Sequence, residues 1–418
     1  MNERIEIKTE GYGETAFDRA KLISWWSQDV ISSSKVLVIG AGAVGNETLK
    51  NLALLGIGSM FICDMDTIST SNLSRTVLFG KKDVGKYKAE LAAERVKEMS
   101  NNPDCKVDYF IGDIVNKLGH GVFRRFDIVL GCLDNMLTRS NVNRRCCLFE
   151  KPYMDAGISE LGLSLNVHHY PESSCLECGM DSKDIAHERM IRYSCDVFKK
   201  RAVQEGHAAT ILISTAIVSA LQVQEAIKAL HQMHGLELEL PIQYGQKYYY
   251  QGMNHLFLQL KIPPKDDCTA HFSFGNIIET HLSAKDTLRN ILDALEELLG
   301  YECVIDTYPD SAFVTTAKCT ICKKEITLNK PMSDIYQDEM YCTDCPKGEN
   351  DGYTSEYVAI DMFGKDSSLL DYTLEQLGIP LLHVLTVRAK DDDFNVKYVE
   401  LTADLNEVLP NTFGSDRY

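Results

Sequence analysis

Basic residues are scarce relative to acidic ones: 43 Lys and Arg stand against 60 Asp and Glu, for a formal net charge of −17. Nucleic-acid grooves are lined with clustered Lys and Arg that neutralise phosphates, so this balance argues against a nucleic-acid partner. Long apolar runs are also lacking. The nearest approach, residues 211–221, contains hydroxyl side chains and is too short to cross a bilayer, so we expect no membrane partner.

A secretory signal is lacking too, because the opening residues MNERIEIKTE contain no apolar core. We therefore expect a cytoplasmic protein, in which the 14 cysteines stay reduced unless they hold a metal or react. The chain has 418 residues, of which 44% are hydrophobic and 25% charged. These values are typical of a globular protein with two or three domains.

Alternating strands and helices are predicted for the first half of the chain. Short apolar runs predict buried strands, and apolar residues at helical spacing predict helices. Such alternation implies parallel βαβ units, so we expect an α/β fold with a Rossmann-like, doubly wound sheet. The last helix should be buried, since its N-terminal half is apolar nearly all round. The strands are expected at 35–39, 60–63 and 126–130, and the helices at 46–55, 83–99 and 210–230.

The chain divides into four parts in this interpretation. Residues 1–34 form an amphipathic helical arm, and residues 35–265 form the α/β domain. Residues 266–350 hold a helix at 284–299 and then a polar stretch with four cysteines. Residues 351–418 are predicted to form a small α+β unit.

A glycine-rich turn follows the first predicted strand and opens the first helix. Its sequence is Gly40-Ala-Gly42-Ala-Val-Gly45, and Asp64 ends the second strand 19 residues later. The glycines permit close backbone approach, and the helix N-terminus offers free N–H groups to a phosphate. A carboxylate at the end of the second strand can accept hydrogen bonds from ribose hydroxyls. The pattern predicts a nucleotide site.

A nicotinamide dehydrogenase would have the same turn, so other residues must discriminate. Asp66, Asn72, Arg75 and Lys88 follow the second strand, and Cys132-Leu-Asp134-Asn follows the strand at 126–130. A hydride-transfer site has little need of two cations, an amide and further acids near the phosphates. An ATP site with chemistry at phosphorus does need them, because charge spreads over the phosphate oxygens.

With these motifs in order, the chain resembles the ThiF/MoeB/HesA family, the adenylating fold shared with ubiquitin-activating enzymes. The resemblance covers about residues 15–235. It implies ATP- and magnesium-dependent adenylation of the C-terminal glycine of a ubiquitin-like protein, on a sheet of the ThiF type. It depends on the glycine turn, the D-x-D pair, S-N-L-x-R, G-x-x-K, C-x-D-N and the end of the helix at 210–230.

The resemblance also implies roles for individual residues. Asp64 is similar to the family's ribose ligand, and Asp134 to its magnesium ligand and catalytic acid. Asn72, Arg75 and Lys88 resemble the groups that hold the triphosphate. Lys86 competes with Lys88, but the spacing from Gly85 favours Lys88.

The N-terminal arm adds one further candidate. Arg19 is similar to a family arginine that in some members reaches into the active site of a dimer partner. The family fold usually pairs through its adenylation domains, so we expect a homodimer.

Two C-x-x-C pairs, Cys319 with Cys322 and Cys342 with Cys345, are separated by 19 residues. This spacing is typical of four-thiolate zinc ribbons. A redox dithiol is the alternative, but it would not need two matched pairs. The sequence therefore predicts a structural zinc.

A third pair, Cys175 and Cys178, has a possible complement in Cys268 and His271, about ninety residues further on. Family members often clamp zinc between such a pair and a second one beyond the long helix. Here the second pair is C-x-x-H, which still supplies four ligands that zinc accepts. The alternative is that Cys175 and Cys178 have no such complement, and that Cys268 and His271 lie on a surface loop.

Cys195 is the candidate nucleophile, since it lies among basic residues between the third pair and the long helix. Neighbouring cations lower the pKa of a thiol, and the thiolate is the attacking form. The stretch resembles the family's crossover loop, whose cysteine can accept the acyl group as a thioester and pass it to a conjugating enzyme. No large cysteine domain intervenes, which is a departure from the eukaryotic enzymes.

Three functions stay open at this point. The first is activation of a ubiquitin-like protein, and the second is adenylation of a sulfur-carrier protein in cofactor biosynthesis. The third is a non-catalytic scaffold subunit of an activating heterodimer. Retention of Arg75, Lys88 and Asp134 speaks against a scaffold.

Overall fold

A computed structural model describes residues 15–180, 211–307, 311–335, 339, 342, 344–345 and 355–413. In this part of the chain, eight strands form the large sheet in the order β3-β2-β1-β4-β5-β6-β7-β8. The first five in this order are parallel, and β6, β7 and β8 continue the sheet as antiparallel strands. The strands are β1 (Lys35–Ile39), β2 (Ser59–Cys63), β3 (Lys106–Phe110), β4 (Ile128–Gly131), β5 (Tyr153–Ile158), β6 (Gly162–His168), β7 (Gln246–Gln251) and β8 (Leu256–Lys261).

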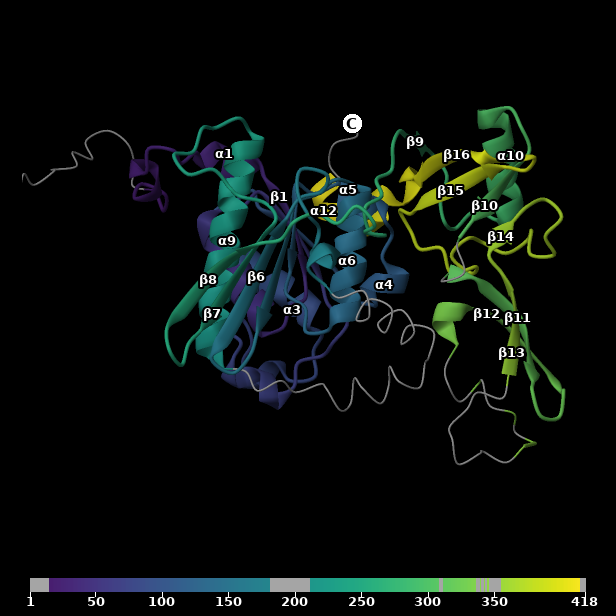
Figure 1. Ribbon diagram of the computed structural model, residues 1–418, viewed down its shortest axis with the longest axis horizontal. Helices are drawn as coiled ribbons and strands as arrows, with labels where there is room; N and C mark the ends of the chain where they lie inside the picture. The colour runs from purple at the N-terminus through teal and green to yellow at the C-terminus, as the bar shows by residue number, and fades with distance from the viewer. Residues whose placement is uncertain are drawn as a thin grey trace, which may run out of the picture.

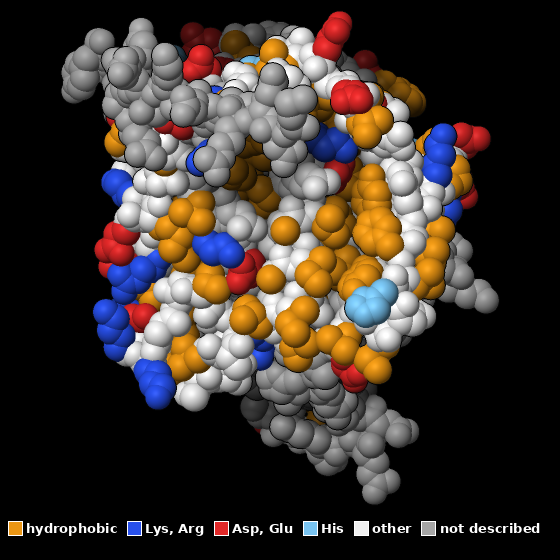
Figure 2. Space-filling model, turned by 90° about the vertical axis from the view of Figure 1, so that its left-hand side faces the viewer, with side chains coloured by type: hydrophobic (Ala, Val, Ile, Leu, Met, Phe, Trp, Pro, Cys, Tyr) orange, Lys and Arg blue, Asp and Glu red, His pale blue; other side chains and the backbone are white. Residues whose placement is uncertain are grey.

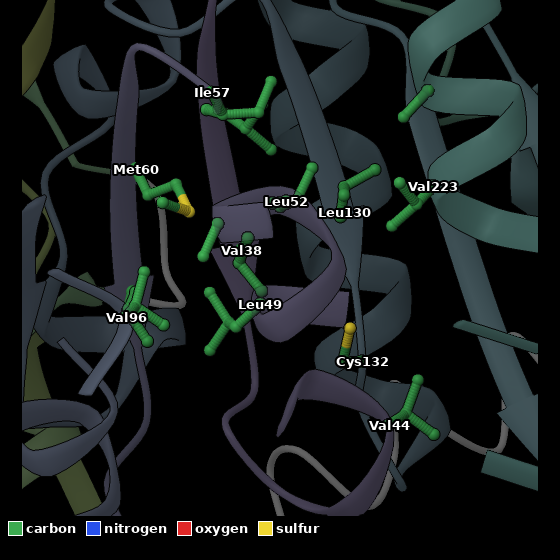
Figure 3. Close-up of a cluster of buried hydrophobic side chains, with 14 of the residues drawn as sticks. Val38, Val44, Leu49, Leu52, Ile57, Met60, Val96, Leu130, Cys132 and Val223 are labelled. Carbon is green, nitrogen blue, oxygen red and sulfur yellow. The ribbon is translucent and has the colours of Figure 1, made fainter. Parts of the chain in front are cut away.

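Helices cover both faces of this sheet (Figure 1). Apolar residues of α2 (Ala43–Leu55), α3 (Lys88–Met99) and α9 (Leu212–Met233) share one core with the strands, part of which Figure 3 shows. On the other face lie α4 (Ile114–Lys117), α5 (Gly121–Arg124), α6 (Met136–Leu148) and the C-terminal α12 (Pro410–Phe413). The predicted α/β class with a doubly wound sheet is confirmed. None of the described helices combines the length and apolar character needed to cross a membrane.

Two predicted helices differ in detail. The helix expected at 83–99 begins only at Lys88, because residues 85–87 bend back to hydrogen-bond with the loop at 67–68. The expected arm is not one helix over residues 15–34 but a 3₁₀ turn, η1 (Ala20–Leu22), and a short helix, α1 (Gln28–Ser33). Between them Trp25 and Trp26 pack around His231 of α9, which prevents a continuous helix.

The expectation that the N-terminal half of α9 is buried is wrong for several of its side chains. Ile213 is 60% exposed, and Leu212 and Ile217 are also exposed. One side of the helix packs on the sheet, but nothing in the described part of the chain covers the other. The apolar residues of this segment therefore lie on two surfaces, one packed on the sheet and one exposed.

The C-terminal lobe lies on the right of Figure 1 and contains a second sheet in the order β14-β10-β15-β16-β9. α10 (Leu288–Leu299) packs on one face of it, so helix and strands share one core. This sheet joins strands from before and after the predicted boundary at residue 350, since burying α10 requires both groups of strands. The strands are β9 (Ile277–Thr280), β10 (Cys303–Asp306), β14 (Met362–Phe363), β15 (Val384–Ala389) and β16 (Asp392–Leu401).

A third sheet, in the order β12-β11-β13, lies below this lobe in Figure 1 and carries cysteines at the end of its central strand. Its strands are β11 (Phe313–Cys319), β12 (Glu325–Pro331) and β13 (Ser355–Ile360). Ion pairs join the lobe to the large sheet's helices: Arg124 and Arg125, at the end of α5, bind the buried carboxylate of Glu400 on β16.

Candidate active site

The glycine turn and the loop after β4 touch at the carboxyl end of the parallel strands. Gly40 has a φ of +98°, and a Cβ placed there would lie 2.4 Å from the carbonyl oxygen of Cys132. A Cβ on Gly45 would lie 2.0 Å from the carbonyl oxygen of Gly40. Any larger side chain would separate the two loops. The glycines thus bring a helix N-terminus next to the loop that carries Asp134.

Asp64, at the end of β2, is fixed by the glycine turn. Its carboxylate accepts the backbone N–H of Ala41 at 2.6 Å and the backbone N–H of Asp66 at 2.8 Å. Burial raises the pKa of this carboxyl, while Lys88 and the two N–H donors oppose the rise. The site therefore holds an acid beside the free N–H groups of α2, as a nucleotide ribose and phosphates require.

The two candidate lysines have different partners. The ammonium group of Lys88, at the start of α3, donates to the carboxylate of Asp66 at 2.7 Å and is largely buried. Lys86 instead pairs with Asp83 at 3.2 Å, and its side chain is 53% exposed. Lys88 is thus connected to the glycine turn through Asp66, whose backbone N–H donates to Asp64.

Asn72 and Arg75 lie in and directly after η2 (Thr70–Ser74), where both stabilise the loop itself. The Asn72 side chain accepts the backbone N–H of Ser69 at 2.9 Å, and the Arg75 guanidinium donates to the carbonyl oxygen of Ser71 at 3.0 Å. Their loop is thus ordered, with both side chains half-buried.

Asn46 is a site residue that the sequence reasoning missed. This fully buried side chain donates to the carbonyl oxygen of Ala41 at 2.7 Å and accepts the backbone N–H of Leu78 at 3.0 Å. It therefore links the glycine turn to the loop after Arg75. One feature of the sequence could have identified it: a polar amide stands at a position of α2 that helical spacing predicts to be buried.

Asp134 is exposed on the loop between β4 and α6, where ligands can reach it. Asn135 caps α6 by accepting the backbone N–H of Thr138 at 2.8 Å, and its amide lies 3.5 Å from the Asp134 carboxylate. The carboxylate oxygens of Asp134 therefore keep free lone pairs.

Arg19 lies at the other end of the sheet. It precedes η1, whose neighbour Phe17 lies against Gly56, just before the start of β2. The glycine turn is at the far end of β1, roughly 16 Å away for a strand of this length. Within one subunit, the structure does not bring Arg19 together with Asp64 or Asp134.

The third cysteine pair meets its predicted complement. The ligand atoms of Cys175, Cys178, Cys268 and His271 all lie within 4.8 Å of one another. The sulfur separations of 3.6 and 3.8 Å fit the edge of a tetrahedron around zinc, about 3.8 Å for Zn–S bonds of 2.3 Å. The four residues could hold zinc.

This cluster is tied to the helix that follows the Asp134 loop. Glu177, which lies between Cys175 and Cys178 in the sequence, is buried. Its carboxylate accepts two hydrogen bonds from the guanidinium of Arg144 on α6, at 2.7 and 2.6 Å. The ring of Tyr170 stacks on His271 with centroids 4.6 Å apart. The site thus has the hydrogen-bonded, apolar surroundings of a structural metal centre.

The second cluster lies on the three-stranded sheet. The sulfur atoms of Cys319 and Cys345 are 3.9 Å apart, and those of Cys322 and Cys342 are 3.6 Å apart. All four sulfur atoms lie within 4.8 Å of one another, as a four-thiolate zinc site requires. Cys195 lies outside the described residues.

The sequence profile of the ThiF family matches residues 16–270, which is more than half of the chain. This chain belongs to the ThiF family. It is 35% identical over 179 residues to SUMO-activating enzyme subunit 2 of Dictyostelium discoideum, an alignment that covers 43% of this ThiF-family chain and 25% of the relative. It is 41% identical over 143 residues to ubiquitin-activating enzyme E1 1 of Candida albicans, covering 31% of this chain and 14% of that one. Both activating enzymes thus extend far beyond the aligned part.

A longer alignment joins this ThiF-family member to adenylyltransferase and sulfurtransferase MOCS3 of Drosophila persimilis. The two are 25% identical over 325 residues, which is 74% of this chain and 67% of that one. Among solved structures, Escherichia coli MccB with ATP superimposes with a TM-score of 0.51 and 21% identity. That match covers 63% of this chain and 75% of MccB and supports the ThiF-type fold.

Proposed function

We propose that this protein adenylates the C-terminal carboxylate of a ubiquitin-like protein with ATP. The observation that carries the proposal is the contact between Gly40 and Cys132, which joins a nucleotide-binding turn to the loop of Asp134. The activating-enzyme relatives support the choice of a ubiquitin-like substrate. A net charge of −17 favours a substrate with a basic face.

The reaction needs help because a carboxylate is an anionic, weak nucleophile toward an anionic phosphate. Its oxygen attacks the α-phosphorus of ATP, the bond to pyrophosphate breaks, and an acyl adenylate and pyrophosphate result. Asp64 would accept from the ribose, and the N–H groups at the start of α2 would face the phosphates. Arg75 and Lys88 would offset the repulsion, with Lys88 exchanging Asp66 for a phosphate oxygen. Asn72 would donate its amide to the phosphates.

Magnesium belongs to this proposal, and Asp134 fits as its protein ligand because its carboxylate is exposed beside the turn. When bound, the ion neutralises phosphate charge.

The proposal includes a second step at Cys195, where the thiolate displaces AMP from the adenylate and forms a thioester for transfer to a conjugating enzyme. The basic neighbours of this cysteine in the sequence support it. The proposal includes a cytoplasmic location, where cysteines stay reduced for thiolate chemistry and zinc binding.

We further propose a homodimer through the face shown in Figure 2, where hydrophobic side chains gather over α9 and the β7–β8 hairpin. Phe257 of β8 is 51% exposed on the side of the sheet that α9 covers, because it pairs with Tyr250, which packs in the α9 core. Leu256, Leu258 and Leu260 are also exposed, on the opposite side of the same strand. An apolar area of this kind is typical of an interface. Arg19 would then act in the partner's site, because it lies far from the glycine turn of its own subunit.

Adenylation of a sulfur-carrier protein is the second candidate, favoured by the longer alignment with MOCS3. Both functions share the first step. They differ in the product, which is a protein thioester in one case and an acyl persulfide or thiocarboxylate in the other.

The test is ATP–pyrophosphate exchange with magnesium and a panel of ubiquitin-like and sulfur-carrier proteins. Exchange that Asp134→Ala and Lys88→Ala abolish, and that the matched control Lys86→Ala retains, supports adenylation. No exchange with any carrier would overturn it. Non-reducing gels then follow the adduct, and an adduct that survives Cys195→Ala removes this cysteine from the thioester step.

Mixing variants tests the dimer and Arg19 together. If Arg19 acts in the partner's site, Arg19→Ala and Asp134→Ala are each inactive, but their mixture recovers about a quarter of the exchange activity. Recovery should fail if Phe257→Glu on both chains breaks the dimer, which sedimentation would show. Activity of a monomeric Phe257→Glu variant would contradict the proposal.

A further inference from the structure

Arg139, in the first turn of α6, lies against the loop that carries Asp134. Its Nε donates to the carbonyl oxygen of Leu133 at 3.0 Å, and its Nη2 donates to the same oxygen. Nη2 also donates to the carbonyl oxygen of Ala156 on β5, at 3.1 Å. One guanidinium thus joins the peptide next to Asp134 to a central strand of the sheet.

A buried carboxylate holds the guanidinium in place. Asp155 of β5 is fully buried and lies 3.2 Å from Nη1 of Arg139. It also accepts from the hydroxyl of Tyr153 at 3.1 Å and from the amide of Asn166 at 3.2 Å. A buried carboxylate with this many donors has one orientation, so the arginine that pairs with it is also fixed.

The position of Arg139 has no advantage for the helix itself. A cation in the first turn is disfavoured by the helix dipole, whose N-terminal end is positive. Gly157 moreover leaves room for the guanidinium, since a Cβ there would lie 3.0 Å from Nη1 of Arg139. The packing around Gly157 therefore makes room for Arg139, although helix stability alone would not favour a cation in the first turn of α6.

We propose that Arg139, anchored by Asp155, is a positioning residue that fixes the Leu133–Asp134 peptide and so aims the Asp134 carboxylate at the reacting phosphate. The inference rests on the adenylation function proposed above. The loop's other hydrogen bonds hold the peptides on either side: the N–H of Cys132 donates to the carbonyl oxygen of Ile39 at 2.8 Å, and Asn135 caps α6. Arg139 acts on the carbonyl that directly precedes Asp134.

The test compares Arg139→Lys with a matched variant, Arg145→Lys, in the exchange assay. Arg145 is another largely buried arginine of α6 whose guanidinium donates to backbone carbonyls, but it fixes residues 114–118 instead. Lysine cannot bridge the Leu133 carbonyl, the Ala156 carbonyl and Asp155 at once. A third variant, Arg139→Ala with Asp155→Asn, removes the guanidinium without leaving a buried charge unpaired.

We expect Arg139→Lys and the double variant to lower kcat on the order of 10- to 100-fold, because small displacements of a catalytic group are costly. The KM for ATP should stay within about twofold, since the glycine turn and Asp64 are untouched. Arg145→Lys should keep the wild-type kcat, although its Tm should fall by as much as that of Arg139→Lys or by more.

Three results would overturn the inference alone. The first is a wild-type kcat in Arg139→Lys, and the second is a loss of kcat in Arg145→Lys as large as the loss in Arg139→Lys. The third is a rise in KM that accounts for the whole effect. Lack of exchange in the wild-type protein is a different result, since it overturns the proposed function and with it the step that Arg139 would serve.

Discussion

The backbone N–H of Ala41 donates to the carboxylate of Asp64 across the ends of two parallel strands, with 2.6 Å between nitrogen and oxygen. The bond links the turn that would face the phosphates to the acid that would face the ribose. The same contact therefore arranges both halves of the proposed nucleotide site. The parallel pairing of β1 with β2 makes this contact possible, because it brings Ile39 and Cys63 side by side.

Replacement of Asp64 by Ala should raise the KM for ATP tenfold or more, equivalent to about 1.4 kcal/mol of binding free energy. The ribose acceptor and the anchor of the turn are lost together. Asp64→Asn keeps an acceptor for Ala41 and should have a smaller effect. Pyrophosphate exchange at varied ATP measures both, and an unchanged KM in Asp64→Ala would exclude this carboxylate from nucleotide binding.

Removal of single cysteines should divide the zinc content in a predictable way. The wild-type chain should bind two zinc ions, and Cys178→Ser or Cys322→Ser should each leave one, because the two clusters share no ligand. Cys105→Ser, at a buried cysteine outside both clusters, is the control and should keep two. Elemental analysis of the purified proteins gives the stoichiometry. Two zinc ions in Cys178→Ser would reject the first site.

The C-terminal helix should depend on Asp108 of β3. Its buried carboxylate accepts the backbone N–H groups of Asn411 and Thr412, both at 2.9 Å, and thereby caps α12 against the large sheet. Asp108→Ala should cost about 2–4 kcal/mol of unfolding free energy, because these donors lose their acceptor. Denaturant unfolding measures the loss.

Asn411→Ala is the comparison for this effect. It removes only the amide's bonds to Asp108 and Val107, at 2.8 and 3.0 Å, so its cost should be smaller. Equal stability of Asp108→Ala and the wild-type chain would show that packing of the C-terminal segment does not need the cap.

Acid should weaken the junction between the two lobes through His120 and His383, whose rings lie 4.2 Å apart. Burial, together with the nearby charge of Arg145, lowers the pKa of His383 to about 3. Burial and His383 lower the pKa of His120 well below 6.5. The unfolded chain then binds protons that the folded protein does not. The stability that the two neutral histidines contribute to the folded protein is therefore fully present above pH 6.5. It is lost as the pH falls below that value.

Each histidine should contribute a slope of up to about 1.4 kcal/mol per pH unit below pH 6.5. His383→Asn should flatten the pH dependence of the unfolding free energy by that amount. The control is His255→Asn, at an exposed position with a φ of +55° that asparagine tolerates. A profile that His383→Asn leaves unchanged would contradict the assignment.

Local spacing was enough to predict where several of the candidate residues lie in the fold. The glycines, Asp64 and Lys88 each stand at a fixed distance from a strand or helix end, so their place at the sheet edge follows from the parallel fold. The partners within each zinc cluster were also predictable. A zinc site needs four ligands, so each C-x-x-C pair requires a second pair of ligands. For Cys175 and Cys178, the sequence offers Cys268 and His271.

Other features could not be read from the sequence, because they depend on residues far apart in the chain. Nothing near Arg139 in the sequence shows that Asp155 would pair with it, and the same holds for Asp108 and Thr412. The apolar half of α9 was predicted to be buried because periodicity reports how apolar a surface is. It does not report whether the protein's own chain covers that surface.

The sequence by itself determined the α/β class, the glycine-rich turn and the residue sets that could hold a metal, since these follow from local periodicity and from chemistry that few residue types supply. Only the tertiary structure decided where Arg19 lies, which strands the C-terminal sheet joins and how the Asp134 loop is held. Those arrangements come from packing and hydrogen bonds between distant segments, whose energies depend on the whole fold.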